Sequence, residues 1–346
     1  MIETLPSPPG LLIIGGESVE GPLSSAETFG LENCTVPPLP ETRYGHAAFL
    51  TSSQQLAVCG GWWEGKPRST DCLVLNKTSG QWERGLLGEL HGQSVRGVVS
   101  TRDGGIYIIH ETDTSYLSAS STIWVSGPTL PFSTECSCKI SESTFVVVGG
   151  FLQNSVREYA AISDNPTSNK GWQGEDLWPT LKTGRKGPGC AATDTHLIVA
   201  GGMSGWQEVL STVEIIQLKS KALGRGENMK QARAFFSIAV VGETHQRLLA
   251  IGGQDTSSYI LTTEFWGEEE DEWETGPSLG RARSSSGVVS VSADIACSAT
   301  ATTQNYFCPT TDGNICMLSS GGGSKTKDNL TNLREQKLFL AIFDNL

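Results

Sequence analysis

Short apolar runs that end in two consecutive glycines recur along this chain of 346 residues, and they constrain its fold more than any other feature. The runs read LLIIGG, LAVCGG, FVVVGG, LIVAGG and LLAIGG, and they end at Gly16, Gly61, Gly150, Gly202 and Gly253. Each run has the length and the flanking turn residues of a strand that is buried on both faces. Paired glycines permit positive φ and the close approach of a neighbouring backbone. Such units must pack several sheets together, because one sheet cannot bury both of its faces alone.

The spacing of the runs reveals one further, less regular member. Neighbouring runs lie roughly 50 residues apart, but the interval between Gly61 and Gly150 is about twice as long. IYIIHE, residues 106–111, occupies the gap, with His110 and Glu111 in place of the two glycines. A tryptophan follows four of the six runs, where it can cover the core between neighbouring sheets. These tryptophans are Trp82, Trp124, Trp172 and Trp273.

Six units with a double glycine and a trailing tryptophan resemble the kelch repeat. The resemblance implies an all-β fold, a six-bladed kelch-type β-propeller with one four-stranded blade per unit. The residues before Leu11 are too few and too rich in proline to form the innermost strand of the first blade. RARSSSGVVSVSA, residues 281–293, matches RYGHAAFLT at the start of another blade, so we expect this C-terminal strand to complete the first blade and close the ring.

The expected organisation is therefore a propeller over residues 11–293 and an irregular, cysteine-containing tail over residues 294–346. The leucine-rich end of the tail predicts a short helix. DGNICMLSSGG resembles a strand with its double glycine, so a truncated seventh repeat is the alternative to an irregular tail. The kelch-family adaptors of ubiquitin ligases carry helical BTB and BACK domains before the propeller, and there is no room for them before Leu11. We expect a monomeric, bare propeller.

Composition limits the classes of partner. A net charge of −12 argues against nucleic acid, whose binding depends on clustered lysine and arginine. No apolar run approaches the roughly 20 residues that span a bilayer, and the N-terminus has no signal-peptide pattern.

The nine cysteines and the glycosylation motifs bear on the compartment. Cys59 ends one predicted strand and Cys72 begins the next, so an antiparallel pair would place them opposite each other, close enough for a disulfide. The alternative is two buried free thiols. Asn33 and Asn76 start glycosylation motifs, and Asn76 lies in a predicted hairpin turn. We expect an extracellular protein, with a cytoplasmic one as the alternative.

Residue patterns for metal, cofactor and catalytic sites are weak. Cys136 and Cys138 are too closely spaced for a zinc ligand pair, and the five histidines are scattered singly. His46 is best explained as a structural residue at the entrance of a blade. No nucleophile elbow or phosphate-binding loop is present. We therefore expect a non-catalytic protein without a cofactor, the alternative being an enzyme that acts on a small molecule or sugar in the central channel.

A binding surface is then expected on loops. In kelch propellers the loops after the double glycines and the loops that lead into each blade share one face, where partners usually dock. Tryptophan, tyrosine and arginine are enriched at binding hot spots. The predicted contact residues for a protein or glycan partner are Arg43, Tyr44, Trp62, Trp63, Arg68, Arg185, Lys186 and Trp206. Alternatively, the tryptophans fold back over their own blades and the arginines bond to loop carbonyls. A cytoplasmic, actin-associated adaptor is the other binding function considered.

Overall fold

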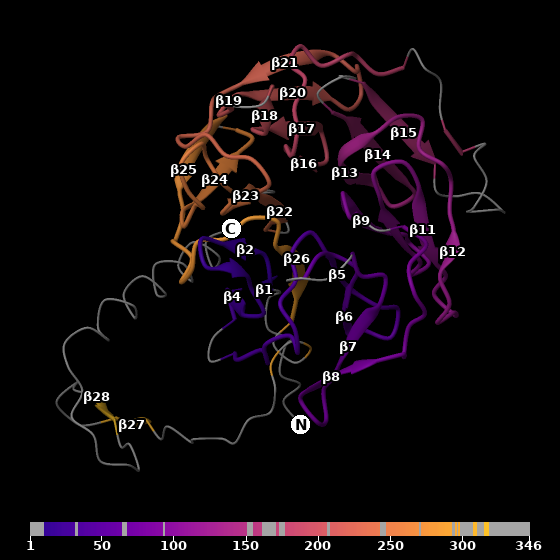
Figure 1. Cartoon of the computed structure of the whole chain (residues 1–346). Coiled ribbons are helices and arrows are strands. Elements are labelled where there is room, and N and C mark those ends of the chain that lie inside the picture. The colour runs from indigo at the N-terminus through magenta and orange to yellow at the C-terminus, as the bar shows by residue number, and fades with distance from the viewer. Residues whose placement is uncertain are drawn as a thin grey trace.

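Six sheets of three or four strands surround a central channel in the computed structural model (Figure 1). The described residues are 10–31, 34–63, 68–92, 94–150, 155–160, 171–172, 177–205, 208–242, 247–269, 271–292, 295, 297, 307–309 and 315–317. This is the six-bladed, all-β propeller that the repeats predicted.

Each blade is an antiparallel sheet whose first strand faces the channel. Blade 1 contains β26 (Gly287–Val291), β1 (Gly10–Ile14) and β4 (Ala26–Phe29). Blade 2 contains β5 (Ala47–Leu50), β6 (Leu56–Cys59), β7 (Cys72–Asn76) and β8 (Gln81–Arg84). Blade 3 contains β9 (Gly97–Ser100), β10 (Ile106–Ile109), β11 (Thr114–Leu117) and β12 (Val125–Ser126). Blade 4 contains β13 (Thr134–Ser141), β14 (Thr144–Gly149) and β15 (Val156–Ala160). Blade 5 contains β16 (Gly189–Ala192), β17 (His196–Ala200), β20 (Val213–Gln217) and β21 (Leu223–Gly226). Blade 6 contains β22 (Ser237–Val241), β23 (Arg247–Ile251), β24 (Thr263–Gly267) and β25 (Glu272–Thr275).

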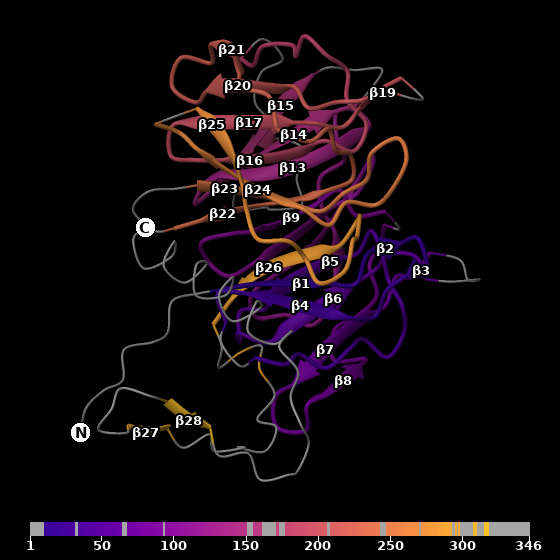
Figure 2. The same ribbon diagram turned by 90° about the vertical axis from the view of Figure 1, so that its left-hand side faces the viewer.

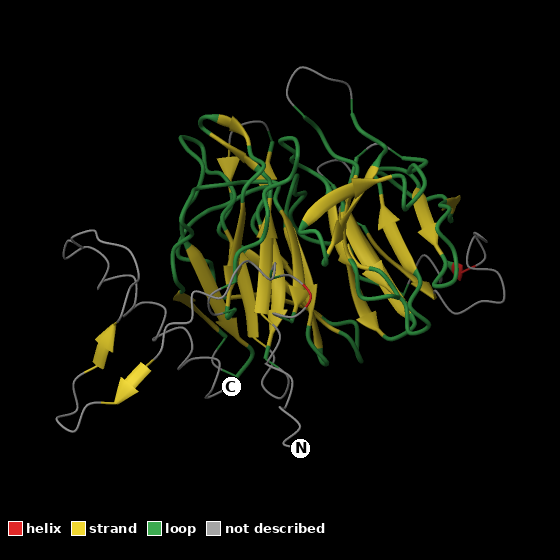
Figure 3. Ribbon diagram, turned by 90° about the horizontal axis from the view of Figure 1, so that it is seen from below, coloured by secondary structure: helices red, strands yellow, loops and turns green. Residues whose placement is uncertain are grey.

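The antiparallel order gives the propeller two distinct faces (Figures 2 and 3). The segments that enter the blades and the segments after the double glycines lie on one face, which we call the loop face. Two short hairpins belong to it, β2 (Glu17–Ser18) with β3 (Gly21–Pro22) and β18 (Met203–Ser204) with β19 (Glu208–Val209). The tight turns between the first and second strands, and between the third and fourth, lie on the opposite face.

Ring closure follows the sequence prediction. β26 pairs antiparallel with β1, from Gly10 opposite Val291 to Ile14 opposite Gly287. A disulfide between Cys34 and Cys297, separated by 263 residues, joins the two ends of the chain a second time. The first blade is thus built from both ends of the propeller, which leaves no open edge at the seam.

The double glycines are required where neighbouring blades meet. Gly15 and Gly16 have φ of +60° and +100°, and a Cβ on Gly15 would lie 2.5 Å from the carbonyl oxygen of Arg43 in blade 2. The Gly16 N–H donates to that same carbonyl at 2.7 Å. Blade 1 can approach blade 2 this closely only because these positions carry no side chain.

The trailing tryptophans also join neighbouring blades, as their spacing suggested. The indole N–H groups donate to carbonyls of the segment before their own blade: Trp82 to Pro37, Trp172 to Thr129 and Trp273 to Glu227, at 3.1, 2.9 and 3.2 Å. Trp124 is buried against Phe49 of blade 2 with the two rings edge to face. The hydrophobic core therefore lies as layers between successive blades.

Beyond the ring, β27 (Phe307–Pro309) and β28 (Ile315–Met317) form a separate two-stranded sheet. The predicted terminal helix lies outside the described residues. Within the described part of the chain, no helix has the length and apolar character needed to span a membrane.

Candidate functional site

Four arginines occupy the same position at the entrance of blades 1, 2, 5 and 6. They are Arg283, Arg43, Arg185 and Arg233, and each is at most 1% exposed. Each Nη1 donates to the carbonyl of the first glycine of its own blade, which is Gly15, Gly60, Gly201 or Gly252, at 2.8, 3.1, 2.8 and 2.7 Å. A buried cation thus satisfies carbonyls that the tight glycine turn leaves outside the sheet.

A carboxylate from the third strand region of each blade completes this arrangement. The partners are Glu27, Asp71, Glu214 and Glu264, with N to O distances of 2.5, 2.8, 3.1 and 2.5 Å. Burial lowers the pKa of each arginine, and the adjacent carboxylate opposes that shift by charge and by hydrogen bonding. Removing either partner would leave an uncompensated buried charge, so these pairs are structural.

Burial overturns part of the predicted binding surface. Arg43 and Arg185 were expected to contact a partner, but both side chains lie inside their blades, and the prediction for these two residues is wrong. The alternative, internal bonding to loop carbonyls, is what the structure shows. The carbonyl of Arg43 also accepts the N–H of Gly16, so this residue joins two blades.

Backbone bridges on the loop face place the residues next to these arginines. The residue after each arginine forms an antiparallel bridge with the residue after a double glycine. The pairs are Tyr44 with Trp62, Lys186 with Met203, Ala234 with Gln254, and Ser284 with Glu17. In the first pair, Tyr44 N–H donates to Trp62 at 3.0 Å and Trp62 N–H donates to Tyr44 at 2.8 Å. Equivalent positions therefore present different side chains around the loop face.

In blade 2 this bridge holds a group of aromatic and cationic side chains. The rings of Tyr44 and Trp62 stack with centroids 6.2 Å apart and planes inclined by 14°. The guanidinium carbon of Arg68 lies 4.2 Å from the Trp62 ring centroid, a cation–π geometry. All three side chains are half-buried, so one side of each remains accessible. The structure thus brings together three of the predicted contact residues.

Two residues that the sequence did not single out adjoin this group. Burial and the charge of Glu17 raise the pKa of Tyr44, while Arg68 lowers it. Burial and Glu17, which accepts a hydrogen bond from the phenol, also raise the pKa of Tyr259 in blade 6. Glu17 lies next to both phenols, and we call these five residues of blades 1, 2 and 6 the aromatic patch. Glu17 was detectable as the residue after Gly16, equivalent to Trp62, whereas no sequence signal marks Tyr259.

The remaining predicted contact residues lie elsewhere. Trp63 turns back over its own blade, with the guanidinium carbons of Arg43 and Arg84 at 5.4 and 5.6 Å from its ring centroid. Lys186 is exposed on the loop face of blade 5, apart from the patch. Trp206 and the glycosylation candidate Asn33 lie outside the described residues.

A family model described as the Kelch motif matches residues 184–222. This segment starts just before Arg185 and includes the double glycine of blade 5, and the same arrangement of strands recurs around a six-bladed ring. The chain is a kelch-repeat β-propeller. No curated protein is significantly similar to it.

The least regular kelch unit, blade 3, replaces the double glycine with a hydrogen-bonded histidine. His110 is buried, and its Nδ1 and Nε2 lie 2.7 Å from the Ser94 carbonyl and 2.8 Å from the Ser115 hydroxyl. Burial lowers the pKa of His110. The hydrogen bonds of the His110 imidazole therefore hold the loop of blade 3 at the position where blades 1, 2, 5 and 6 have two glycines with positive φ.

Three disulfides form among the described cysteines of the kelch propeller. The predicted bridge between Cys59 and Cys72 is present, joining β6 to β7 with Cα atoms 4.1 Å apart. Cys136 and Cys190 join β13 of blade 4 to β16 of blade 5, which the sequence did not reveal. Cys138 has a free thiol whose pKa burial raises to about 12, which makes it a poor nucleophile.

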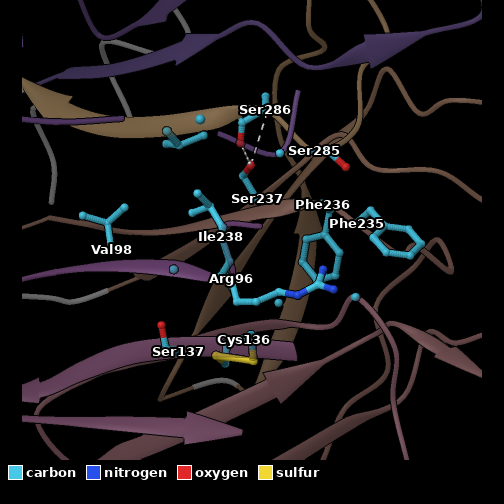
Figure 4. Close-up of a pocket in the computed structure, with 18 of the residues that line it drawn as sticks. Arg96, Val98, Cys136, Ser137, Phe235, Phe236, Ser237, Ile238, Ser285 and Ser286 are labelled. Atoms are coloured by element: carbon cyan, nitrogen blue, oxygen red, sulfur yellow. Dashed lines mark hydrogen bonds between the residues drawn. A yellow bond between two sulfur atoms is a disulfide. The ribbon is translucent and has the colours of Figure 1, made fainter. Parts of the chain in front are cut away.

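The central channel of the kelch ring contains a cavity of about 300 Å³ lined by residues from all six blades (Figure 4). Its wall is mixed, with glycines and serines, the charged residues Arg96 and Glu135, and the apolar residues Val98, Ile238 and Val288. No group of three or more potential metal ligands gathers among the residues that the structure describes.

Proposed function

We propose that this protein is a non-catalytic interaction module that binds a protein partner with the aromatic patch on its loop face. The stacked Tyr44, Trp62 and Arg68 group carries the proposal. Tryptophan, tyrosine and arginine are the residue types that dominate binding energy at protein interfaces.

The patch is organised before any partner arrives. Two backbone hydrogen bonds hold Tyr44 against Trp62, and the planar groups of Trp62 and Arg68 restrict each other. Ordering a long, mobile side chain on binding costs about 0.5–1.5 kcal/mol, and a preformed arrangement avoids much of that loss. The patch therefore suits rapid, specific recognition by a folded or extended protein segment.

The charges of the patch favour a protein over a glycan. Arg68 already covers part of the Trp62 ring, which reduces the open aromatic surface on which a sugar would stack. Glu17 and Arg68 offer opposite charges on one small surface, and a protein segment with both acidic and basic groups can complement both.

We propose an extracellular location for this interaction. The disulfides support it, because cytosolic thiols are kept reduced. Asn76 supports it as a glycosylation site, because it lies at the start of an exposed turn in which its Oδ1 accepts the Thr78 N–H at 2.9 Å. A cytoplasmic adaptor is the competing proposal, and the state of the cysteines distinguishes the two.

A photo-crosslinking experiment tests the patch. A benzophenone amino acid is placed at Val19, which is 76% exposed in the β2–β3 turn of the loop face. The matched control places it at Ile123, which is 67% exposed in the turn between β11 and β12 on the opposite face. We expect a discrete protein adduct from Val19 and none of that mass from Ile123.

Variants within the patch then show whether the adduct depends on it. Trp62→Ala and Arg68→Ala should each reduce its yield at least about tenfold, since hot-spot truncations change binding by about 2 kcal/mol or more. An undiminished adduct in both variants, or an equal adduct from Ile123, would contradict the proposed surface. Circular dichroism establishes that the variants remain folded.

A further inference from the structure

The central channel has the size and wall of a small-ligand site. Its inner strands β5, β9, β13, β16, β22 and β26 each pair on one side only, so their other edges face the channel. Strand edges present backbone N–H and C=O groups, and the cavity of about 300 Å³ lies at the small end of the range for small-molecule sites. A ligand here would be small and able to form hydrogen bonds.

Two opposite charges line this cavity without pairing with each other. Arg96 precedes β9 and Glu135 lies near the start of β13 in the adjacent blade, and no ion pair joins them. The nearest carboxylate to Arg96 is Glu111, with Nη2 and Oε2 3.7 Å apart, and Arg96 Nε is buried without a hydrogen-bond partner in the described structure. A buried N–H without an acceptor is unfavourable, so Arg96 would gain from a ligand that offers an acceptor, and Glu135 could receive a ligand cation.

A hydroxyl group adds a third polar contact between these charges. Ser137 lies two residues after Glu135 on β13, beyond a β-bulge between Thr134 and Cys136, and both residues line the cavity. Its Oγ is buried and, among described atoms, has no partner. Gly97 faces it across the blade boundary, and any Cβ at that position would collide with the Ser137 side chain. The Ser137 hydroxyl therefore occupies the space that the missing side chain of Gly97 leaves next to Arg96.

Glu135 also holds one end of a hydrogen-bonded rim at the mouth of the channel. Gly187 N–H donates to its Oε2 at 3.1 Å, Phe235 N–H donates to the Gly187 carbonyl at 2.8 Å, and Ser285 N–H donates to the Phe235 carbonyl at 2.8 Å. Phe235 and Ser285 adopt positive φ of 53° and 50°, at the position where blades 2 and 5 have glycine. Strained non-glycine residues kept at a channel mouth are typical of functional sites.

We propose that the channel binds a small zwitterion of the α-amino acid class with an apolar side chain. Its carboxylate would meet Arg96 and Ser137, its ammonium would meet Glu135, and its side chain would lie against Val98, Ile238 and Val288. A ligand with one charge could complement either Arg96 or Glu135, but not both. The zwitterion satisfies both, and Figure 4 shows Arg96 extending into the cavity beside Phe236. This site is independent of the aromatic patch.

Calorimetric titration of the whole protein with L-leucine and two analogues tests the inference. Leucinamide lacks the carboxylate, and N-acetyl-leucine lacks the ammonium. We expect leucine to bind and each analogue to bind at least about tenfold more weakly, because hydrogen bonds to charged groups are the stronger ones. Absence of leucine binding at millimolar concentration, or equal binding of the three compounds, overturns the proposal.

Two conservative variants assign the charges. Arg96→Gln should remove the preference for leucine over leucinamide, and Glu135→Gln should remove the preference over N-acetyl-leucine while still accepting the Gly187 N–H. Arg102→Gln and Glu208→Gln, at exposed positions outside the cavity, are the matched controls and should bind leucine as the wild type does. Unchanged selectivity in both cavity variants would also overturn the proposal. The comparison of the three ligands on the wild-type protein holds even if a variant fails to fold.

Discussion

Arginines of this propeller serve two different purposes, depending on what surrounds their guanidinium groups. Arg233 is fully buried and binds Gly252, Thr262 and Glu264 inside its blade. Arg68 lies half-exposed over an aromatic ring on the loop face. Residue type alone suggested a contact role for both kinds, which is why Arg43 and Arg185 were assigned wrongly. Only the position of the glycine carbonyls and carboxylates separates structural arginines from those that can contact a partner.

His46 shows how closely the blades constrain a single residue. A Cβ on Gly15 or Gly287 would lie 2.7 or 2.8 Å from its imidazole ring, so the ring fills space left by two glycines of blade 1. Burial, together with the charge of Arg43, lowers the pKa of His46 to about 3 from the usual 6.5. The sequence-based interpretation of His46 as a structural residue agrees with this enclosure.

This shift predicts a pH dependence of stability. Below pH 6.5 the unfolded chain binds a proton at His46 that the folded protein binds only near pH 3, so the free energy of unfolding falls on acidification between these values. At pH 5 the loss from His46 is about 2 kcal/mol relative to pH 7.5. His46→Gln should lose that much less over the same interval in urea denaturation. Parallel pH profiles for His46→Gln, wild type and the half-exposed control His196→Gln would contradict this prediction.

Among the elements, β26 and β1 form the seam of the ring, where the two ends of the propeller meet. Their pairing brings together strands from opposite ends of the propeller, so it must overcome the entropy of closing almost the whole chain. The Cys34–Cys297 disulfide spans the same seam. Strand pairing and the disulfide therefore both stabilise the seam. Together they keep the ring closed at the place where no peptide segment connects the two ends of the propeller.

The contribution of the seam disulfide to stability can be measured by comparing it with a disulfide that closes a much shorter loop. By the chain-entropy estimate, the bridge across 263 residues stabilises the protein by about 5.6 kcal/mol and the bridge across 13 residues by about 3 kcal/mol. Cys34→Ala with Cys297→Ala should therefore lower the free energy of unfolding in guanidinium more than Cys59→Ala with Cys72→Ala. The reverse order would show that the seam is stabilised mainly by strand pairing and packing.

On the scale of the whole molecule, the two proposed binding sites and the Asn76 turn lie on different surfaces. The aromatic patch lies on the loop face, Arg96 and Glu135 line the channel, and the Asn76 turn lies on the opposite face. A glycan at Asn76 would therefore leave both proposed binding sites accessible. The ring makes this separation possible, because each blade contributes one segment to every surface.

The intact mass of protein expressed through a secretory pathway tests the proposed extracellular location. We expect a glycan that is removed by deglycosylation and absent from Asn76→Gln, since the turn is exposed. We also expect the six bridged cysteines to resist alkylation until the protein is reduced. If all nine cysteines are alkylated without reduction and no glycan is added, the extracellular proposal fails and a cytoplasmic partner becomes the better candidate.

The amino-acid sequence alone predicted the repeat number, the hidden third unit and the closing C-terminal strand, and it placed Cys59 opposite Cys72 with two free thiols as the alternative. The first three follow from the periodicity of the repeats and from the match between residues 281–293 and the start of another blade, and the fourth follows from the pairing of adjacent strands. The burial of Arg43 and Arg185, the bridges of Cys34 with Cys297 and Cys136 with Cys190, and the meeting of Glu17, Tyr44 and Tyr259 emerged only in the folded ring. The physical reason is that these features depend on contacts between blades or across the seam. Such contacts join residues far apart in the chain, and the closure and angular placement of the blades decide which of them meet.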